Sequence, residues 1–380
     1  MNILKQTPLA TAVKRATMCA ATAALLTTTS MALADHEAEG GGSDLEVKIS
    51  GYVKVDAIYD LDQDLGPSFF AGGIDTDPNA SSNPSFQMHA KQSRLNVTAS
   101  KEHVKVVIEG DFFTPEGNQL ISNSSGFRLR HAYGQVGNFL AGQTWSTFMD
   151  KNWVLYPTTV DFGGPAAATF IRQAQFRWSV TPSLDLAIEN PENRIEGEDH
   201  RDTLPDFVAR YARTGTVSWQ VAGMAQQFEV DGGANDGLNE SNFAYTGGIN
   251  IAFGKGSSVS AKVNVNANRY TYYGWMNPAA VVNNGSLETI DHVGGLVAYN
   301  IGWGGKSNAK STIALGSVQF DDEFLAPGDV DNISTLHVNY RWNPWNNVEF
   351  GAEVMFGDQE LVNGNTGDAT RLQFATKFNF

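Results

Sequence analysis

The sequence predicts a 16-stranded antiparallel β-barrel that spans a membrane, and three observations support this fold class. Apolar and polar residues alternate in segment after segment, the pattern of strands with one face in lipid and the other in water. The connections between these segments alternate between short and long. The chain also ends on an aromatic residue, Phe380, with no polar tail after it.

The first 34 residues are expected to be an export signal and not part of the folded domain. Basic residues precede a short apolar stretch at 18–26, and an Ala-Leu-Ala site ends at Ala34. The acidic, glycine-rich segment 35–45 is too short for a coiled coil and is expected to be a periplasmic linker. The barrel is therefore predicted to occupy residues 46–380.

Composition disfavours several other classes of protein. The 380 residues include 41 acidic and 26 basic side chains, for a net charge of −15. No nucleic-acid partner is expected, because phosphate backbones are bound by an excess of Lys and Arg. Past residue 34, no apolar run reaches the roughly 18 to 20 residues of a spanning helix. The single cysteine, Cys19, lies in the export signal, so no disulfide or thiol chemistry is expected in the mature chain.

Alternation of apolar and polar residues defines the expected strands in chain order. They are 47–59, 94–99, 104–112, 127–130, 139–145, 176–178, 184–188, 207–211, 217–221, 243–253, 259–267, 293–301, 313–319, 336–342, 348–356 and 372–380. Short connections are expected at 100–103, 136–138, 181–183, 214–215, 254–257, 302–308 and 343–346. Long ones are expected at 61–85, 114–125, 146–170, 191–205, 230–241, 271–289, 321–331 and 357–369. With both chain ends on one side, all short turns are periplasmic and all long loops extracellular.

A soluble β-sandwich would also alternate, but sixteen strands facing one core would need two packed sheets with bends. Strands of about ten residues match what a tilted membrane strand requires. Aromatic residues near strand ends are expected to form interfacial girdles: Trp145, Trp178, Tyr211, Tyr270, Tyr340, Trp342 and Phe378. The terminal Phe380 continues the outward apolar set of the last strand. It is the expected assembly signal for the barrel-insertion machinery of a Gram-negative outer membrane.

The polar parity of the strands predicts an inner wall with a positive excess. Twelve cations share this parity: Lys48, Lys54, Arg94, Lys105, Arg128, Arg130, Arg177, Arg210, Lys262, Arg341, Arg371 and Lys377. Eight anions do so: Asp56, Glu109, Asp111, Asp185, Glu189, Asp206, Glu349 and Glu353. Cations on the first six strands should form a patch that attracts small organic anions, and guanidinium groups suit carboxylates. The alternative is that the arginines pair with Glu109 and Asp111 and only stiffen the wall. Arg341 and Arg371 are expected on the far wall, because their strands are remote from that patch in the chain.

The third long connection, 146–170, is aromatic-rich and poor in charge, so we expect it to fold into the lumen. Asp150 and Asp161 would then face the basic wall across a constriction. The alternative is an extracellular flap packed on a neighbouring subunit.

Several motifs resemble the DcaP-like outer-membrane porins. They are Gly51–Asp56, Gln92–Leu95, Glu109–Phe113, Arg128–Tyr133, Leu140–Phe148, Asp161–Pro165 and Arg172-Gln173, all in the first half of the mature chain. The resemblance implies a homotrimer, an infolded third loop and passive passage of small organic anions such as dicarboxylates. The candidate pore residues are then Lys54, Arg94, Arg128, Arg130, Arg172 and Arg177.

Other functions have weaker support in the sequence. A barrel phospholipase would need an outward Ser, His and acid at the membrane rim, and His131 shares the outward parity of Leu129. A structural or adhesive barrel would have a plugged lumen. The acidic loop runs at 196–202 and 321–323 could bind a divalent ion or bridge lipopolysaccharide phosphates, although such runs are usually solvated. No hydrolase, zinc or phosphate-loop motif is present, so no enzyme, cofactor or metal is expected.

Overall fold

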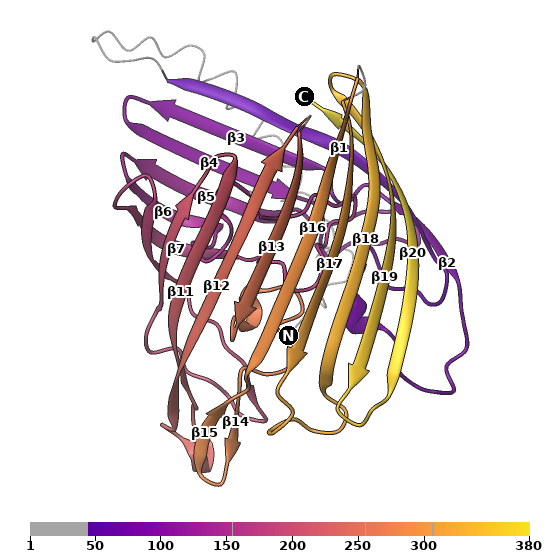
Figure 1. Cartoon of the computed structure of the whole chain (residues 1–380). Coiled ribbons are helices and arrows are strands. Elements are labelled where there is room, and N and C mark those ends of the chain that lie inside the picture. Colours follow the sequence, from indigo (N-terminus) through magenta and orange to yellow (C-terminus); the bar gives the residue numbers. More distant parts are fainter. Residues whose placement is uncertain (1–44, 154, 255, 306–307) are drawn as a thin grey trace, which may run out of the picture. The chain divides into compact units, whose positions relative to one another are not determined.

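The computed structural model describes residues 45–380 except 154, 255 and 306–307. Seventeen strands of this part form one closed antiparallel sheet, the wall (Figure 1), and three short strands form a separate small sheet. The wall strands are β1 (Glu46–Asp60), β2 (Ser85–His89), β3 (Arg94–Lys101), β4 (Val104–Asp111), β5 (Arg128–Val136), β6 (Phe139–Trp145), β7 (Arg172–Ser179), β8 (Leu184–Glu189), β10 (Asp206–Arg213), β11 (Val217–Glu229), β12 (Asn239–Phe253), β13 (Ser257–Val265), β16 (His292–Gly304), β17 (Ala309–Phe320), β18 (Val330–Trp345), β19 (Val348–Leu361) and β20 (Thr366–Asn379). The expected export signal and linker lie outside the described residues, apart from Leu45.

The ring closes where β1 pairs with β20, from Tyr52 opposite Asn379 to Asp60 opposite Arg371. On its other side, β1 pairs first with β3 and then with β2, so these two short strands occupy one position in the wall. The 17-stranded sheet is therefore a barrel with 16 strand positions, as predicted. The break between β2 and β3 was not predicted.

The outer face of the wall is apolar. Along the strands, exposed residues of this face alternate with buried residues of the inner face. Along β11, Val217, Trp219 and Val221 are exposed to between 38% and 52%, whereas Ser218 and Gln220 between them are buried. On the outer face of β6 and β7, Phe139 stacks on Trp178 with ring centroids 5.9 Å apart. This belt is what a lipid-facing barrel surface requires.

The connections carry short elements of their own. These are the 3-10 turns η1 (Ala71–Gly73), η2 (Lys151–Trp153), η3 (Gly233–Asn235) and η4 (Asn268–Tyr270), and the strands β9 (Ile195–Glu196), β14 (Ala280–Asn283) and β15 (Ser286–Thr289). Within the described ranges, no helix has the length and apolarity to cross a membrane. The prediction of a long loop at 357–369 was wrong. Strand β19 continues to Leu361 and β20 begins at Thr366, so only a tight turn lies between them.

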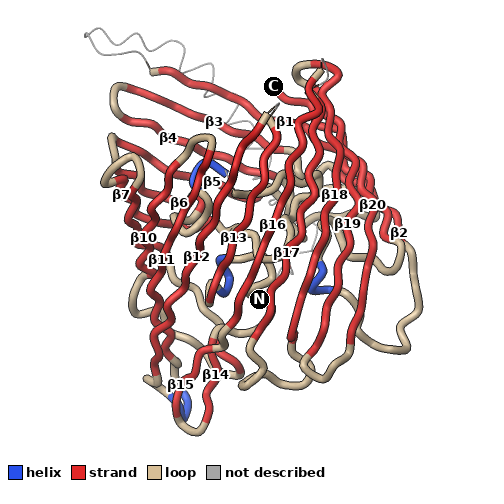
Figure 2. The backbone as a smooth tube through the Cα atoms, in the orientation of Figure 1, coloured by secondary structure: helices blue, strands red, loops and turns tan. Residues whose placement is uncertain are grey.

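Parts of three connections pack inside the ring of strands: 65–74, 146–171 and 266–278 (Figure 2). The rest of the last of these connections forms the β14–β15 hairpin, which pairs with β9 and extends beyond the wall. The infolded parts bury an apolar core against the inner faces of β16 to β20, with members Phe69, Ala166, Ala167, Ala168, Tyr272, Tyr273, Leu296, Ala314, Val318, Ile333, Met355 and Ala369. The prediction of a wet inner face is therefore wrong for β16 to β18, because protein and not water lies against it. The infolding of the third loop, defined here as 146–171, is confirmed, and that of the other two connections was not predicted.

Glycines on the inner wall make room for the third loop. A Cβ at Gly316 would collide with the carbonyl oxygen of Ala166, and one at Gly294 would lie 2.8 Å from the Ala167 Cβ. Real Cβ atoms do not approach so closely, so these positions need glycine for the close approach of two backbones. The loop is seated against β16 and β17 by shape. Its hydrogen bonds here are with the strands on either side: Asn264 on β13 donates to the carbonyl of Ala167, and the N–H of Ala166 donates to Thr335 Oγ1 on β18.

Candidate functional site

A cavity of about 470 Å³ lies between the third loop and the inner faces of β1, β3 to β6 and β18 to β20. Its cationic lining residues are Lys54, Arg94, Arg130, Arg341 and Lys377, and its anionic ones are Glu109, Asp161 and Glu349. Cations therefore outnumber anions at this surface. The lining that comes from the end of β6 and the third loop is largely aromatic, with Trp145, Trp153, Tyr156, Phe162 and Phe170.

Three arginines on β3 and β5 share two carboxylates on β4. Glu109 Oε1 lies 2.9 Å from Arg130 Nε and 3.4 Å from Arg94 Nε. Asp111 accepts two hydrogen bonds of 2.9 Å from Arg128 and one of 2.9 Å from Arg130. The sequence left open, as an alternative, that the arginines pair with Glu109 and Asp111, and this pairing is present in part. One positive charge remains uncompensated in this group of five residues.

The third loop rests on this basic wall through an aromatic ring. Phe162 stacks on Phe113 with ring centroids 4.3 Å apart. The guanidinium carbons of Arg128 and Arg130 lie 5.2 Å and 5.9 Å from the centre of the Phe162 ring, in cation–π range. Phe162 was not predicted as a site residue, although its place beside Asp161 in the Asp161–Pro165 motif was a usable signal.

Arg172, a candidate pore residue, lies over the indole of Trp145, with its guanidinium carbon 4.7 Å from the centre of the ring. Within the described residues it forms no ion pair, and its Nη1 is buried without a hydrogen-bond partner. Trp145 points toward His131 and the cavity and not toward lipid, so its assignment to an interfacial girdle was wrong. Tyr270 was also misassigned, since it is fully buried and donates to Asp206 at 2.7 Å.

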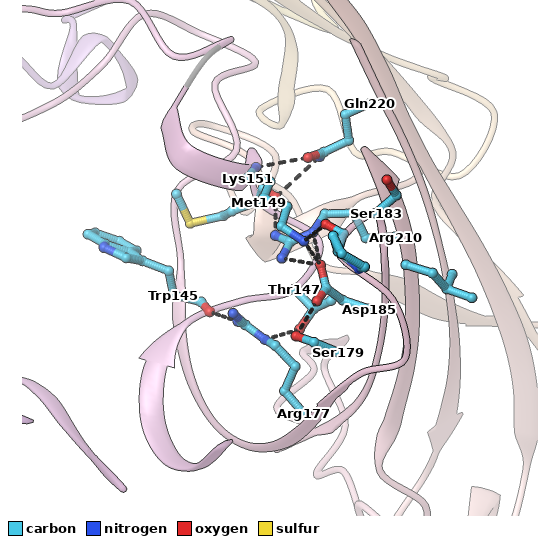
Figure 3. A network of polar contacts seen from close by, with 12 residues as sticks. Trp145, Thr147, Met149, Lys151, Arg177, Ser179, Ser183, Asp185, Arg210 and Gln220 are labelled. Atoms are coloured by element: carbon cyan, nitrogen blue, oxygen red, sulfur yellow. Dashed lines mark hydrogen bonds and ion pairs between the residues drawn. The ribbon is translucent and has the colours of Figure 1, made fainter. Parts of the chain in front are cut away.

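Arg177 holds the beginning of the third loop and does not line the cavity (Figure 3). Its Nε donates to Thr147 Oγ1 at 2.8 Å and to Gln175 Oε1 at 3.0 Å, and its Nη2 donates to the carbonyl of Trp145. Next to it, Arg210 Nη1 donates to the carbonyl of Met149 at 2.9 Å. These arginines act as anchors of the loop.

The expected placement of Asp150 was wrong, and that of Asp161 holds only in part. Asp150 pairs with Lys262 on β13 at 2.5 Å, with both side chains buried, so it does not face the basic wall. Asp161 does line the cavity. However, its Oδ2 accepts from the Ser68 hydroxyl at 2.8 Å and from the Phe69 N–H at 3.1 Å, which ties it to the first long connection.

Two further orientations differ from the prediction. A β-bulge at Arg130 sets His131 opposite Glu109 and turns it inward, where Nδ1 lies 3.0 Å from Thr144 Oγ1. This removes the residue that motivated a phospholipase site. Arg341 was expected on a distant wall, but closure of the ring brings β18 to β20 next to β1, and Arg341 lines the same cavity as Arg94.

The loop side of the cavity stays uncharged apart from Asp161. Burial holds the pKa of Tyr156 well above its usual range, so its hydroxyl remains neutral at physiological pH. Among the described residues, no group of three or more His, Cys, Asp or Glu side chains is arranged to hold a metal ion. The acidic runs at 196–202 and 321–323 therefore gain no support as ion sites.

The model of the DcaP outer membrane protein family matches residues 31–380. The chain belongs to that family. Among solved structures, this family member is similar to the outer membrane channel DcaP of Acinetobacter baumannii, with a TM-score of 0.78 and 20% identity over 90% of this chain and 99% of that one. It is also similar to an anion-selective porin from Comamonas acidovorans, with a TM-score of 0.55 and 14% identity over 89% of this chain and 100% of that one.

The trimer form of OmpT from Vibrio cholerae has a TM-score of 0.53 and 11% identity, over 88% of this chain and 99% of that one. A comparison with curated proteins finds no match. At these identities the solved structures show the fold alone, whereas the family match shows membership. This DcaP-family barrel is thus an outer-membrane porin of a Gram-negative bacterium.

Proposed function

We propose that this porin is a passive diffusion channel for small organic anions such as dicarboxylates. The observation that carries the proposal is the five-to-three excess of cations over anions at the cavity. A positive lining raises the local concentration of anions, and conduction needs several weak sites and not one tight site. The anion selectivity of one structural neighbour, the porin from Comamonas acidovorans, is consistent with the proposal.

Among the arginines that line the cavity, Arg94 and Arg341 have the most hydrogen-bonding capacity left for a solute. The one carboxylate near Arg94 is shared with Arg130, and Arg341 lies 3.9 Å from Glu349, which pairs more closely with Lys377 at 2.9 Å. Guanidinium donors that are not fully used inside the protein can hold a carboxylate in a bidentate fork. Two such forks on different sides of one cavity favour solutes with two carboxylates.

The remaining candidates take different parts in this proposal. Arg130, Arg128 and Arg172 supply the background field beside Phe162 and Trp145, and Asp161 is the negative group on the loop side. Arg177 anchors the loop. Lys54 is considered separately below.

The test is a reversal-potential measurement on the purified channel in a planar bilayer with a salt gradient. We expect anion preference, reduced to a similar extent by Arg94→Gln and by Arg341→Gln. Lys105→Gln is the matched control, because Lys105 is exposed and does not line the cavity. A short aliphatic dicarboxylate should reduce the chloride current more than the monocarboxylate of equal length does.

Cation preference of the unaltered channel would refute the proposal. A channel without any conductance would favour the structural or adhesive barrel, and lipase activity of the purified protein would favour the phospholipase alternative.

We also propose that the porin is a homotrimer inserted by the barrel-assembly machinery among lipopolysaccharide and outer-membrane lipid. Strands β3 to β8 and β10 have only 6 to 9 residues each. A tilted strand needs about 9 to 11 residues to cross a bilayer, so contact with a neighbouring protomer would suit this low wall better than lipid. Phe176, 67% exposed on this wall, should be buried in such a contact. Native mass spectrometry tests it: Phe176→Lys should convert trimers to monomers.

A further inference from the structure

The backbone of Val160, at the tip of the third loop, is held at its N–H and at its carbonyl by side chains of opposite charge. Its carbonyl accepts a hydrogen bond from Lys54 Nζ on β1 at 2.6 Å. Its N–H donates to Glu353 Oε2 on β19 at 2.6 Å, and the next N–H, of Asp161, donates to the same oxygen at 2.8 Å. Since β1 and β19 flank β20, the two charges reach the loop from either side of one strand.

Both charged groups are fully used within the protein. The Lys54 ammonium also lies 2.9 Å from Asp56 and donates to Gln92 Oε1 at 2.5 Å. Oε1 of Glu353 accepts from Asn339 Nδ2 at 3.3 Å and lies 3.3 Å from His337 Nδ1. Glu353 is 2% exposed and does not line the cavity. Neither group has a free donor or acceptor to offer a solute.

The wall around Glu353 is shaped to receive the loop tip. A Cβ at Gly351, on the same inner face, would lie 2.7 Å from Val160 Cγ2. On β18, the side chain of Asn339 donates to the carbonyl of Thr158 at 2.9 Å. Backbone groups of the tip are therefore bound by side chains from three strands, β1, β18 and β19, and the Val160 side chain packs against a glycine.

We propose that Lys54 and Glu353 are positioning residues that set the width of the constriction by holding the tip of the third loop, residues 158–162. This proposal rests on the proposed function, because ion selectivity is defined only for a conducting channel. It deepens that function by separating the charges that position the loop from those that meet solutes. In this assignment, Lys54 is not a solute-binding cation although it lines the cavity.

The sharpest test exploits the opposite signs of the two charges. Lys54→Met and Glu353→Gln should both increase the single-channel conductance and the current noise, and both should move the reversal potential toward zero, because each releases the same loop tip. If the charges instead act directly on ions, Lys54→Met lowers anion preference, Glu353→Gln raises it, and the noise stays unchanged. That pair of opposite shifts would overturn the proposal.

Two variants on the same strand serve as controls. Glu349→Gln removes a carboxylate that lines the cavity without a hydrogen bond to the third loop, so it should raise anion preference with no added noise. Gly351→Ala changes no charge but pushes on Val160, so it should reproduce the noise and the higher conductance. An unchanged current from Gly351→Ala would contradict the proposal even if the charge variants fail to fold. Cation preference of the unaltered channel would refute the proposed function alone, because conductance and noise still report the position of the loop.

Discussion

Replacing Lys262 with Met tests how firmly the third loop is locked into the barrel. The Lys262 and Asp150 side chains are 1% and 2% exposed, and the pair joins the loop to β13. Removing one partner of a buried ion pair leaves an uncompensated charge, which typically costs about 3–5 kcal/mol. Since 1.4 kcal/mol is tenfold in an equilibrium constant, Lys262→Met should lower the folding equilibrium constant by roughly two to three and a half orders of magnitude.

The assay is equilibrium unfolding by urea in lipid vesicles, followed by tryptophan fluorescence and by the electrophoretic shift of the unheated barrel. The double variant Asp150→Asn with Lys262→Met removes both charges. Replacing a whole buried pair by neutral residues is often close to neutral, so the double variant should be more stable than Lys262→Met alone. A single substitution that costs less than about 1 kcal/mol, the range of exposed pairs, or a double variant as unstable as the sum of the singles, would refute this reasoning.

Three further predictions concern other contacts. Deleting Phe380 should lower the yield of folded, heat-modifiable barrel, because its backbone forms two reciprocal hydrogen bonds with Gly51 at 3.1 and 3.2 Å; an unchanged yield would show that the terminal residue only packs. Gly316→Ala should alter single-channel conductance by displacing the third loop, whereas Gly295→Ala, which meets nothing within 4 Å, should not; equal currents from both would contradict the seating of the loop on β17. Arg177→Gln should lower the urea midpoint while leaving the reversal potential nearly unchanged, since Arg177 binds the loop and not the cavity; a large loss of anion preference would return it to the pore.

The wall of the barrel was predictable because each strand repeats one local rule. Residues such as Val217 and Ser218 face lipid and the interior in strict alternation, so the period of two was enough to place the regular stretches of the wall. The rule fails where the backbone departs from it. The bulge at Arg130 reverses the parity of everything after it in β5, and no residue type in that segment marks the irregularity.

The site was less predictable because it depends on contacts between distant segments. Asp150 was correctly placed on an infolded loop, but which wall cation it meets depends on the path of the loop across the lumen. The position of Arg341 could have been inferred, since the last strands of a closed ring must lie next to the first. Reading the strands as a linear series put this residue on the wrong wall.

The seam between β1 and β20 also governs the order of folding. The buried pair of Asp60 and Arg371 joins residues 311 positions apart in the chain. Contacts between residues so far apart in the sequence are slow to form, because the entropy of closing a long loop is lost before the contact is made. Until the last strand arrives, the sheet has two open edges that can template pairing with other chains. Truncated or stalled chains should therefore aggregate instead of forming a smaller barrel, and closure should behave as an all-or-none final step.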